Sequence, residues 1–535
     1  MTTFVTWMLI VSAAASSLLA GRSLMHYFQL ESYQFPGYFR TLRRNLMRAL
    51  LPGAAMTVYL TALFLAHRTF DRYAADPVRL ALALLVLPLA LLGGWWCRGI
   101  FVSRKAKKPF VVTMRVKRTY LVALAVYILI CAAMSFSPWS KKYYCCLFPA
   151  LLPLWTALAG LLAWPIEKLV SEMYFRDAQK KLAARPDLIK IGITGSYGKT
   201  SVKFILGTLL SEKYQTLVTP SSFNTPMGVT RVIREQLMPA HQVFVAEMGA
   251  RHVGDIKELC RLVHPRHGVL TSVGPQHLDT FHTVERIKAT KYELMDAVPA
   301  DGCCFFPDDG AICRELFDRT VKEKRLCSLH PSDDADVWAS DVTVSPAGSR
   351  FTLHTATDSI ACETRLLGEH NIQNILLAAT VCLHLGLSLK QIAHGIARLT
   401  PVEHRLQLIP SQGVTVIDDA FNSNPSGARA ALRVIAGFEG RRIIITPGMV
   451  ELGEGEERFN REFGQEMASS VDVAILVGER HTQPIADGLR EAGFPEEQIH
   501  VVPSLDDAAA LLKQIGRPGD VALFENDLPD NYSEH

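Results

Sequence analysis

Apolar residues are concentrated at the N-terminal end of the chain, and this uneven distribution constrains the fold more than any other feature. Each of five uncharged stretches is close to the roughly 17–25 residues that a membrane-spanning helix requires. They are Phe4–Ala20, Ala49–Ala66, Leu80–Trp96, Thr119–Phe136 and Tyr143–Trp164. We therefore expect a helical membrane domain of about five transmembrane helices in residues 1–165, followed by soluble α/β domains.

The charged residues between these stretches predict the orientation of the chain. Segment 21–48 contains five arginines, segment 97–118 contains eight arginines and lysines, and segment 67–76 balances two arginines against two aspartates. Because basic loops stay in the cytoplasm, we expect a multi-pass protein of the cell (inner or plasma) membrane, with its N-terminus outside and its C-terminal half inside. A cleaved signal peptide is the alternative for the first stretch, although Met1-Thr2-Thr3 offers no positive charge. No span contains a charged residue, so a plain anchor and a lipid-binding role both stay open.

The rest of the chain divides into a linker and two further domains. Apolar residues between 166 and 174 recur at helical spacing, which predicts an amphipathic linker helix over residues 166–187, lying on the membrane surface. We expect a central ATP-binding domain at 188–400 and a C-terminal domain at 401–535. The net charge of +4 is too small to indicate a nucleic-acid partner. Eleven cysteines without a C-x-x-C pair suit a reduced cytosolic compartment.

A phosphate-binding loop is predicted at the start of the soluble half. Leu188–Thr194 has the pattern of a buried strand, residues 194–201 read T-G-S-Y-G-K-T-S, and a helix is expected over Val202–Leu210. A strand, a glycine loop and a helix in this order direct backbone N–H groups and the helix dipole at phosphate. The lysine of such a loop neutralises phosphate charge and the hydroxyl that follows can bind magnesium. The candidate residues are Gly195, Ser196, Gly198, Lys199, Thr200 and Ser201.

This loop has two residues between its glycines rather than four, and it resembles the ATP loop of the Mur ligases, T-G-[ST]-x-G-K-[ST]. Further motifs follow in the family's order from about residue 189 to the C-terminus. The resemblance implies an ATP-dependent ligase that forms an amide bond through an acyl phosphate. It also implies a central P-loop ATPase domain and a Rossmann-like α/β C-terminal domain.

Three further segments resemble the metal-binding motifs of the same family. Glu247 begins E-M-G-A at the end of an expected strand, similar to the E-[ML]-G-A whose glutamate binds magnesium in the D-alanyl-D-alanine-adding members. His277 begins H-L-D, similar to a segment with a second metal ligand. Lys291 lies where these ligases carry a lysine that is often carbamylated, with Lys288 as the alternative. The resemblance therefore implies two Mg²⁺ ions, bound by Thr200, Glu247, His277 and Lys291.

The nucleotide contacts implied by the resemblance continue into the C-terminal domain. Residues 368–375 read G-E-H-N-I-Q-N-I, where Asn371 and Asn374 match asparagines that meet adenine. Arg405 matches an arginine that reaches the phosphates once the last domain closes. Residues 418–425 read D-D-A-F-N-S-N-P, with Asp419 and Asn424 as the matching residues and Phe421 in place of a tyrosine. Residues 448–454 read G-M-V-E-L-G-E and resemble the G-x-M-x-E-L-G of the same members.

The acceptor substrate is the least constrained part of the interpretation. Soluble members of the family begin with a domain that binds a UDP-linked sugar, and here the apolar stretches stand in its place. We expect a UDP-linked or lipid-linked cell-wall precursor, joined to D-alanyl-D-alanine or a similar amino acid or dipeptide. Asn224 matches a substrate-facing asparagine, although Thr225 and Met227 depart from that motif. The alternatives are a poly-γ-glutamate synthase-like or lipid-linked-precursor ligase, an ATP-driven transporter, and a non-catalytic precursor binder.

Overall fold

A computed structural model describes most of the chain, which divides into two units, Met1–Glu172 and Met173–His535. Each unit is described separately below. Arg72, the basic residues between 101 and 108, and Asn422 of the 418–425 segment lie outside the described residues. Those described are 2–31, 33–71, 73, 75–100, 109–135, 142–221, 223–409, 413–421 and 423–528.

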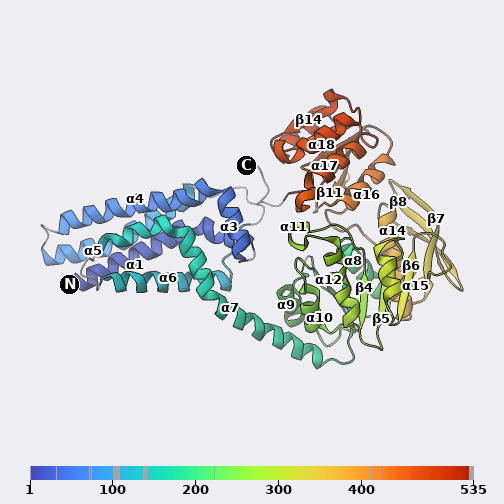
Figure 1. The fold of residues 1–535 in the computed structure, drawn as a ribbon, viewed down its shortest axis with the longest axis horizontal. Helices are drawn as coiled ribbons and strands as arrows, with labels where there is room; N and C mark the ends of the chain where they lie inside the picture. The colour runs from blue at the N-terminus through green and yellow to red at the C-terminus, as the bar shows by residue number, and fades with distance from the viewer. Residues whose placement is uncertain are drawn as a thin grey trace. The chain divides into compact units, whose positions relative to one another are not determined.

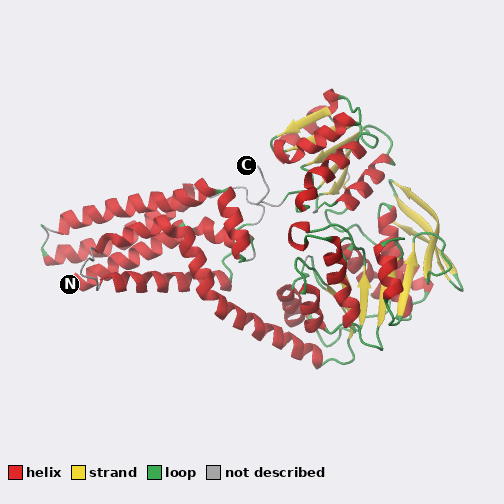
Figure 2. Ribbon diagram, in the orientation of Figure 1, coloured by secondary structure: helices red, strands yellow, loops and turns green. Residues whose placement is uncertain are grey.

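Helices are the only regular elements among the described residues of the first unit, as its composition predicts (Figures 1 and 2). Its small residues allow the helices to approach closely. Ala13 and Ala14 of the first helix are buried, and a Cβ at Gly94 would lie 2.5 Å from the backbone oxygen of Ser16. The elements are α1 (Thr2–Ala20), α2 (Arg22–Leu30), α3 (Phe35–Arg44), α4 (Leu46–Asp71), α5 (Asp76–Ile100), α6 (Met114–Ser135), the 3₁₀ helix η1 (Lys142–Leu151) and α7 (Leu152–Ala183).

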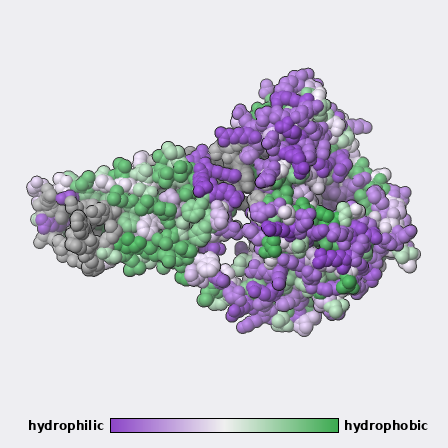
Figure 3. Space-filling view, in the orientation of Figure 1, coloured by the Kyte–Doolittle hydropathy of each residue, from purple (hydrophilic) through white to green (hydrophobic). Residues whose placement is uncertain are grey.

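Three helices of the described residues are long and apolar enough to cross a membrane: Leu46–Phe70, Pro77–Arg98 and Cys146–Ala183. A fourth span results if α1 and α2, which meet at an angle of 49°, count as one broken helix. Much of the visible surface of this unit is hydrophobic (Figure 3). The expected count of five spans, which needs α6 to cross as well, stays a prediction.

α7 joins the last apolar stretch to the predicted linker as one helix. It begins at Leu152 and continues through Pro165 to Ala183, so no break separates a span from a surface helix. The helix ends at Ala183, four residues before the predicted end of the linker at residue 187. Near the middle of α7, buried Glu167 accepts two hydrogen bonds from Arg118, from Nε at 2.5 Å and from Nη2 at 2.7 Å. This bidentate ion pair attaches the start of α6 to α7.

The central domain is built on a nine-stranded sheet, in the order β2-β3-β1-β4-β5-β6-β7-β8-β9. The pairs from β2 to β7 are parallel, and β7, β8 and β9 pair antiparallel. Its strands are β1 (Ile189–Thr194), β2 (Thr216–Val218), β3 (Val243–Glu247), β4 (His267–Leu270), β5 (Cys303–Pro307), β6 (Lys324–Ser328), β7 (Val337–Ser345), β8 (Gly348–Thr355) and β9 (Ser359–Thr364). Its helices are α8 (Lys199–Leu210), α9 (Pro226–Gln236), α10 (Asp255–Val263), α11 (Leu278–Phe281), α12 (Val284–Ala297), α13 (Ile312–Arg319), α14 (Glu369–His384) and α15 (Leu389–Ala397).

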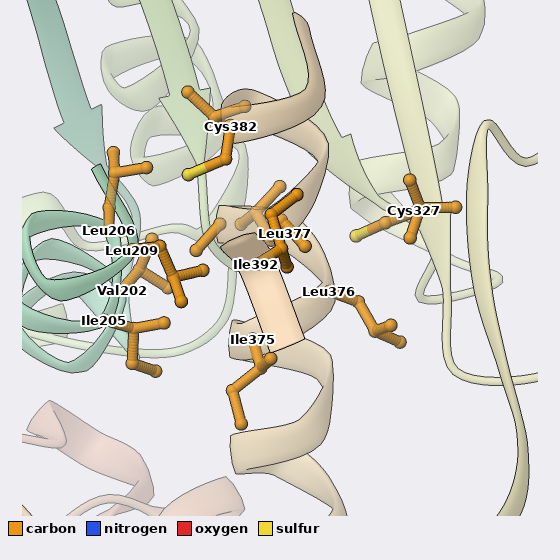
Figure 4. Close-up of a cluster of buried hydrophobic side chains, with 14 of the residues drawn as sticks. Val202, Ile205, Leu206, Leu209, Cys327, Ile375, Leu376, Leu377, Cys382 and Ile392 are labelled. Carbon is orange, nitrogen blue, oxygen red and sulfur yellow. The ribbon is translucent and has the colours of Figure 1, made fainter. Parts of the chain in front are cut away.

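Helices cover both faces of this sheet because its strands alternate between two apolar cores. In β3, Val243 and Val245 pack against α8, α14 and α15, whereas Phe244 packs with α9, α10 and α12. Figure 4 shows the first of these cores, where Val202 and Ile205 of α8 lie beside α14. The N-termini of α8 and α14 are therefore held side by side.

The C-terminal domain has a six-stranded sheet in the order β10-β11-β15-β12-β13-β14, parallel except for β10. Both sheets confirm the α/β class. The strands are β10 (Gln407–Ile409), β11 (Thr415–Asp419), β12 (Arg442–Thr446), β13 (Val473–Val477), β14 (Ile499–Val502) and β15 (Val521–Glu525). The helices are α16 (Pro425–Ala436), η2 (Gly453–Gly455), α17 (Glu456–Met467), α18 (Glu479–Glu491), η3 (Glu496–Gln498) and α19 (Leu505–Ile515).

Candidate active site

The glycine loop between β1 and α8 has the backbone geometry of a phosphate cradle. Gly195 and Gly198 have φ of +151° and +76°, which residues with a side chain rarely adopt. The loop is attached to the segment that follows β4. Ser196 Oγ donates to the carbonyl of Gly274 and accepts from its N–H, both at 3.0 Å. The loop is thus fixed before nucleotide binds, with the N-terminus of α8 directed at the space above it.

Lys199 lies in the first turn of α8 and folds back over this loop. Its ammonium donates to the carbonyls of Gly195 at 2.8 Å and Ser196 at 2.9 Å. Burial lowers the pKa of Lys199 to about 8; Glu247 acts against this and Arg405 adds to it. The ammonium therefore lies over the loop, where a phosphate group would be a more favourable partner for a buried cation than the two carbonyls.

Glu247 ends β3 beside the loop, and its carboxylate is almost fully buried. One oxygen, Oε1, accepts hydrogen bonds from Thr200 at 3.2 Å and from Asn224 at 3.1 Å. The other, Oε2, pairs with Lys203 at 2.9 Å. Burial acts to raise the pKa of Glu247, but the charges of Lys203 and Lys199 outweigh it and hold this pKa below its usual value. The side chain is therefore an anion that three groups hold in one position.

Lys203 is a site residue that the sequence interpretation did not single out. Its side chain is fully buried, and its ammonium also donates to the carbonyl of Ser221 at 2.6 Å. The signal was available, because Lys203 is the one charged residue between Val202 and Leu210. A charge on the apolar face of a helix has to be paired, and a carboxylate at a neighbouring strand end is the natural partner.

The oxygens around Glu247 suit a magnesium ion. Glu247 Oε1 and Thr200 Oγ1 lie 3.2 Å apart next to the phosphate loop, and both are hard oxygen donors of the type that Mg²⁺ prefers. Lys203 engages only Oε2, so Oε1 has neutral donors alone as partners, and a metal ion could take the place of the Thr200 hydroxyl proton there. A magnesium ion usually takes one or two protein oxygens and completes its shell with water and phosphate. The residues present fit that pattern.

His277 is fixed by a contact from the C-terminal domain. It caps α11 with φ of +50°, and its Nδ1 lies 2.7 Å from Glu451 Oε2. Glu451 has a φ of +65° and lies 3.9 Å from Arg251. Since Nδ1 is engaged by the carboxylate, Nε2 is the nitrogen that remains for a metal ion. Sequence similarity had marked the G-M-V-E-L-G-E segment, but not its contact with His277.

Lys291 of α12 is almost fully buried. Burial lowers its pKa well below the usual value, and the charge of Lys199 adds to this while Asp255 and Glu293 act against it. In the described part of the chain, no carboxylate oxygen lies within ion-pair distance of its Nζ. By contrast Lys288, the alternative, pairs with Glu315 at the surface at 2.9 Å. Lys291 is thus a buried amine near the phosphate loop, whereas Lys288 is a surface cation.

The remaining predicted nucleotide residues line one cavity of about 750 Å³ within the second unit. Asn371 and Asn374 face it from the first turns of α14, and Gly198 adjoins Asn374, whose Oδ1 would lie 2.9 Å from a Cβ at that position. Asn371 donates to the carbonyl of Leu367 at 2.8 Å, and its oxygen is therefore the atom left for a ligand. The predicted residues on this cavity are Gly198, Thr200, Ser201, Asn371, Asn374, Arg405, Asp419 and Asn424.

The C-terminal domain contributes two charged side chains and an aromatic ring to the cavity wall. Arg405 stacks on Phe421, with its guanidinium carbon 4.6 Å from the ring centre. Burial raises the pKa of Asp419 to about 6, and the N–H of Leu406 and the charge of Arg405 act against this. Asn424 instead caps α16, accepting from Gly427 N–H at 2.9 Å. Phe421 thus supports Arg405 by stacking, and this contact does not require the hydroxyl group of a tyrosine.

Comparison with known proteins identifies the family. Residues 193–382 match the model of the Mur ligase middle domain, and residues 404–525 match that of the Mur ligase, glutamate ligase domain. The chain is 33% identical over 363 residues to UDP-N-acetylmuramoyl-tripeptide–D-alanyl-D-alanine ligase from Mycobacterium bovis, covering 63% of this chain and 69% of that protein. The chain belongs to the Mur ligase family. It is an ATP-dependent ligase.

Further Mur ligases show the same resemblance in sequence and in fold. The Escherichia coli enzyme of the same name is 30% identical over 307 residues, covering 56% of this chain and 67% of the enzyme. A crystal structure of MurF from Acinetobacter baumannii superposes with a TM-score of 0.62 at 25% identity, covering 68% of this chain and 79% of that one. MurF from Thermotoga maritima in complex with ADP gives 0.61 at 24% identity, with coverage of 68% and 82%. The described fold of the soluble half is thus that of a MurF-like ligase.

Proposed function

We propose that this ligase joins D-alanyl-D-alanine, or a similar amine, to the carboxylate of a peptidoglycan precursor at the membrane. The observation that carries the proposal is the cavity within the second unit. It is lined by Gly198, Thr200 and Ser201, where the phosphate loop meets α8, and by Arg405 and Asp419 of the C-terminal domain. The UDP-N-acetylmuramoyl-tripeptide–D-alanyl-D-alanine ligases are similar over both of these domains.

The reaction needs an activated carboxylate, because a carboxylate and an ammonium ion do not condense in water. ATP, as a substrate, supplies a phosphoryl group to form an acyl phosphate, which the amine then displaces. Lys199 neutralises the phosphate being transferred, and the N–H groups of the loop orient it. Arg405, stacked on Phe421, adds a cation from the opposite wall. Walls from two domains exclude water from an intermediate that hydrolyses easily.

Two magnesium sites complete this proposal. Thr200 and Glu247 would hold one ion, and His277 with Lys291 would hold the second. Bound there, magnesium ions offset the charge on phosphate and carboxylate oxygens. Asn224 and Lys203 keep Glu247 in place for this role, and Glu451 keeps the His277 ring in place.

Lys291 is proposed to act as a carbamate. A plain ammonium here would repel both Lys199 and a metal ion, whereas a carbamate provides oxygen ligands and a negative charge. Its burial supports this, since a buried amine that loses its proton easily can react with carbon dioxide. We expect Lys291→Ala to lose activity and to regain part of it with short carboxylic acids. Lys288→Ala, at the surface pair with Glu315, is the control and should stay active without additive.

The membrane assignment rests on the three to four helices that are long and apolar enough to span a membrane. We propose that they hold the ligase at the cytoplasmic face of the cell membrane, with the N-terminus outside. A lipid-linked acceptor suits such an anchor. A UDP-linked acceptor is the one that appears in the name of the similar ligases. Which of the two is used separates this ligase from other amide ligases of its superfamily.

One experiment tests the activity and the acceptor together. The full-length chain, purified in detergent, is incubated with ATP, Mg²⁺, D-alanyl-D-alanine and either UDP-linked or lipid-linked precursor. We expect phosphate release that requires both amine and precursor, and a product whose mass equals the two joined with loss of water. Phosphate release at the same rate with and without the precursor would contradict the proposal. A preference for the lipid-linked acceptor would give the membrane unit a role in substrate supply.

A further inference from the structure

A second group of side chains, of the types that bind metals, lies at the opposite ends of the strands from the phosphate loop, where β4 and β5 begin. The loop follows the end of β1, whereas β4 and β5 begin with His267 and Cys303, which pair in register. Next to them lie Glu323, which precedes β6, and His384, the last residue of α14. One ligand atom each from Cys303, Glu323 and His384 lie within 4.8 Å of one another. Among the described residues, no other three histidine, cysteine or acidic side chains converge in this way.

His267 orients this group without being a ligand. Its Nδ1 accepts the N–H of Cys303 at 3.2 Å, which leaves the ring proton on Nε2. Its ring meets the His384 ring edge to face, with the centres 5.1 Å apart. The imidazole of His384 is therefore packed in place against a neighbour. Metal sites use such outer contacts to set ring orientation.

The chemistry of the three ligands selects a borderline-soft divalent ion. A thiolate and an imidazole suit zinc and exclude Mg²⁺ and Ca²⁺, which take oxygen ligands. Thiolate and carboxylate together neutralise a charge of +2. His384 also lies at the C-terminus of α14, where the helix dipole favours a cation. Arg325 pairs with Glu323 at 3.1 Å and with Asp336 at 3.0 Å, so an ion bound by Glu323 would displace the first contact and leave Asp336 as the partner of Arg325.

We propose that Cys303, Glu323 and His384 bind a zinc ion, with water in the fourth position, and so tie β5, β6 and α14 together. Zinc binding would release the proton of the Cys303 thiol, since the thiolate is the form that ligates a metal. Glu323 is half exposed, so the group of three side chains reaches the surface at this carboxylate. Since α14 carries Asn371 and Asn374 at its other end, the ion would anchor the helix that faces the nucleotide cavity.

Cobalt spectroscopy on the full-length chain tests this site independently of ligase activity. The protein in detergent is stripped with a chelator, desalted, and titrated with Co²⁺ in excess Mg²⁺. We expect one equivalent to give a thiolate-to-cobalt charge-transfer band and the d–d bands of a tetrahedral ion, both removed by Zn²⁺. Cobalt in the nucleotide cavity gives no thiolate band, because no cysteine is among its described lining residues.

Two variants and a neighbouring control decide the assignment. Cys303→Ser should lose the charge-transfer band. Glu323→Gln changes a half-exposed position. Loss of a residue that only supports a ligand weakens metal binding roughly 10–100-fold, so loss of a ligand itself should weaken cobalt binding by at least that factor. Cys304→Ser is the control, since its side chain packs in the core on the other face of the sheet. Absence of the band in the wild-type chain, its persistence in Cys303→Ser, or unchanged affinity in Glu323→Gln would each overturn the proposal.

Discussion

Glu247 shows how single residues prepare the site before any ligand binds. Its carboxylate is buried, and Lys203, Asn224 and Thr200 all contact it. Burying a carboxylate is costly unless it is paired, so Lys203 is needed for the fold as well as for the position of the proposed metal ligand. Stability and function therefore depend on the same ion pair.

Lys203→Met is expected to be strongly destabilising. It leaves the buried Glu247 carboxylate without its cation, and breaking a buried pair in this way costs about 3–5 kcal/mol. Lys288→Met is the matched control: it removes a surface pair with Glu315, which contributes about 0–1 kcal/mol. The measurement is the free energy of unfolding in urea, in detergent. Equal losses for the two variants would show that the Lys203 pair is not buried as described.

Lys199→Ala should leave the fold intact and abolish turnover. Its ammonium bonds only to loop carbonyls, so its loss costs little stability, whereas the transferred phosphate loses its nearest cation. Removing one preorganised electrostatic contact costs about 10²–10³-fold in kcat. Phosphate release and circular dichroism measure the two effects. A folded variant with normal phosphate release would contradict the assignment of the loop.

At the scale of elements, the proposed nucleotide site depends on the close packing of α8 and α14. Both helices contribute to one apolar core (Figure 4), and Gly198 at the start of α8 meets Asn374 in the second turn of α14. A side chain at Gly198 would push these two N-termini apart. Position 198 therefore requires glycine for two reasons: the close approach of Asn374 and the positive φ.

Gly198→Ala should weaken nucleotide binding more than a comparable change elsewhere. The new Cβ would lie 2.9 Å from Asn374 Oδ1, and the φ of +76° adds strain of about 1–2 kcal/mol. Gly254→Ala is the control, because its φ of +92° is strained in the same way but no atom lies within 4 Å. Titration with ADP measures both. A similar dissociation constant for the two variants would mean that backbone strain alone matters.

The end of β15 connects two loops that face the site. Glu525 is buried and accepts hydrogen bonds from Ser423, in the 418–425 segment, and from Thr446 Oγ1 at 2.9 Å. The next residue, Asn526, accepts from the N–H of Ser423 and donates to the carbonyl of Gly448. The 448–454 segment in turn carries Glu451, which contacts His277. A single strand end thus positions both loops.

Glu525 should make stability depend on pH. Burial raises its pKa to about 7 from an ordinary value near 4.5, so ionising it is unfavourable in the folded state. Stability is then lost as the pH rises from about 4.5 to 7 and is constant above that. Glu525→Gln should remove this loss, for a gain of up to about 3 kcal/mol at pH 8 and none near pH 4. Urea unfolding at several pH values measures it, with Glu497→Gln at the exposed surface as control. A gain that does not change with pH would contradict it.

Local patterns were enough to predict some elements and not others. The strand, loop and helix around Lys199 could be predicted, because their signals lie within about twenty consecutive residues. The pair of Lys203 with Glu247 joins positions 44 residues apart, and that of His277 with Glu451 joins positions 174 apart. The periodicity of a sequence does not indicate which residues so far apart are in contact. Only the order of the family's motifs placed those residues in one site. The continuity of α7 through Pro165 was missed because a change of composition suggested a break.

At the scale of the whole molecule, the count of crossings decides on which side of a membrane the ATP site lies. If the basic segment 97–118 is cytoplasmic, the chain must cross an even number of times between it and the soluble half, which needs ATP. α7 belongs to one candidate span. α6 is therefore required as another span, and its residues from Thr119 to Ser135 carry no charge. Omitting α6 would place the catalytic domains outside the cell.

Reporter fusions test this topology. Alkaline phosphatase, active only outside, should be active when fused after residue 72, and should be inactive when fused after residue 107 or residue 187. The physical reason is the charge of the loops: segment 97–118 carries eight basic residues, which resist translocation, whereas segment 67–76 is balanced. A cytoplasmic reporter such as green fluorescent protein should give the opposite pattern at each position. Activity of phosphatase at residue 187 but not at 107 would mean that α6 does not cross, and the site would then lack access to ATP.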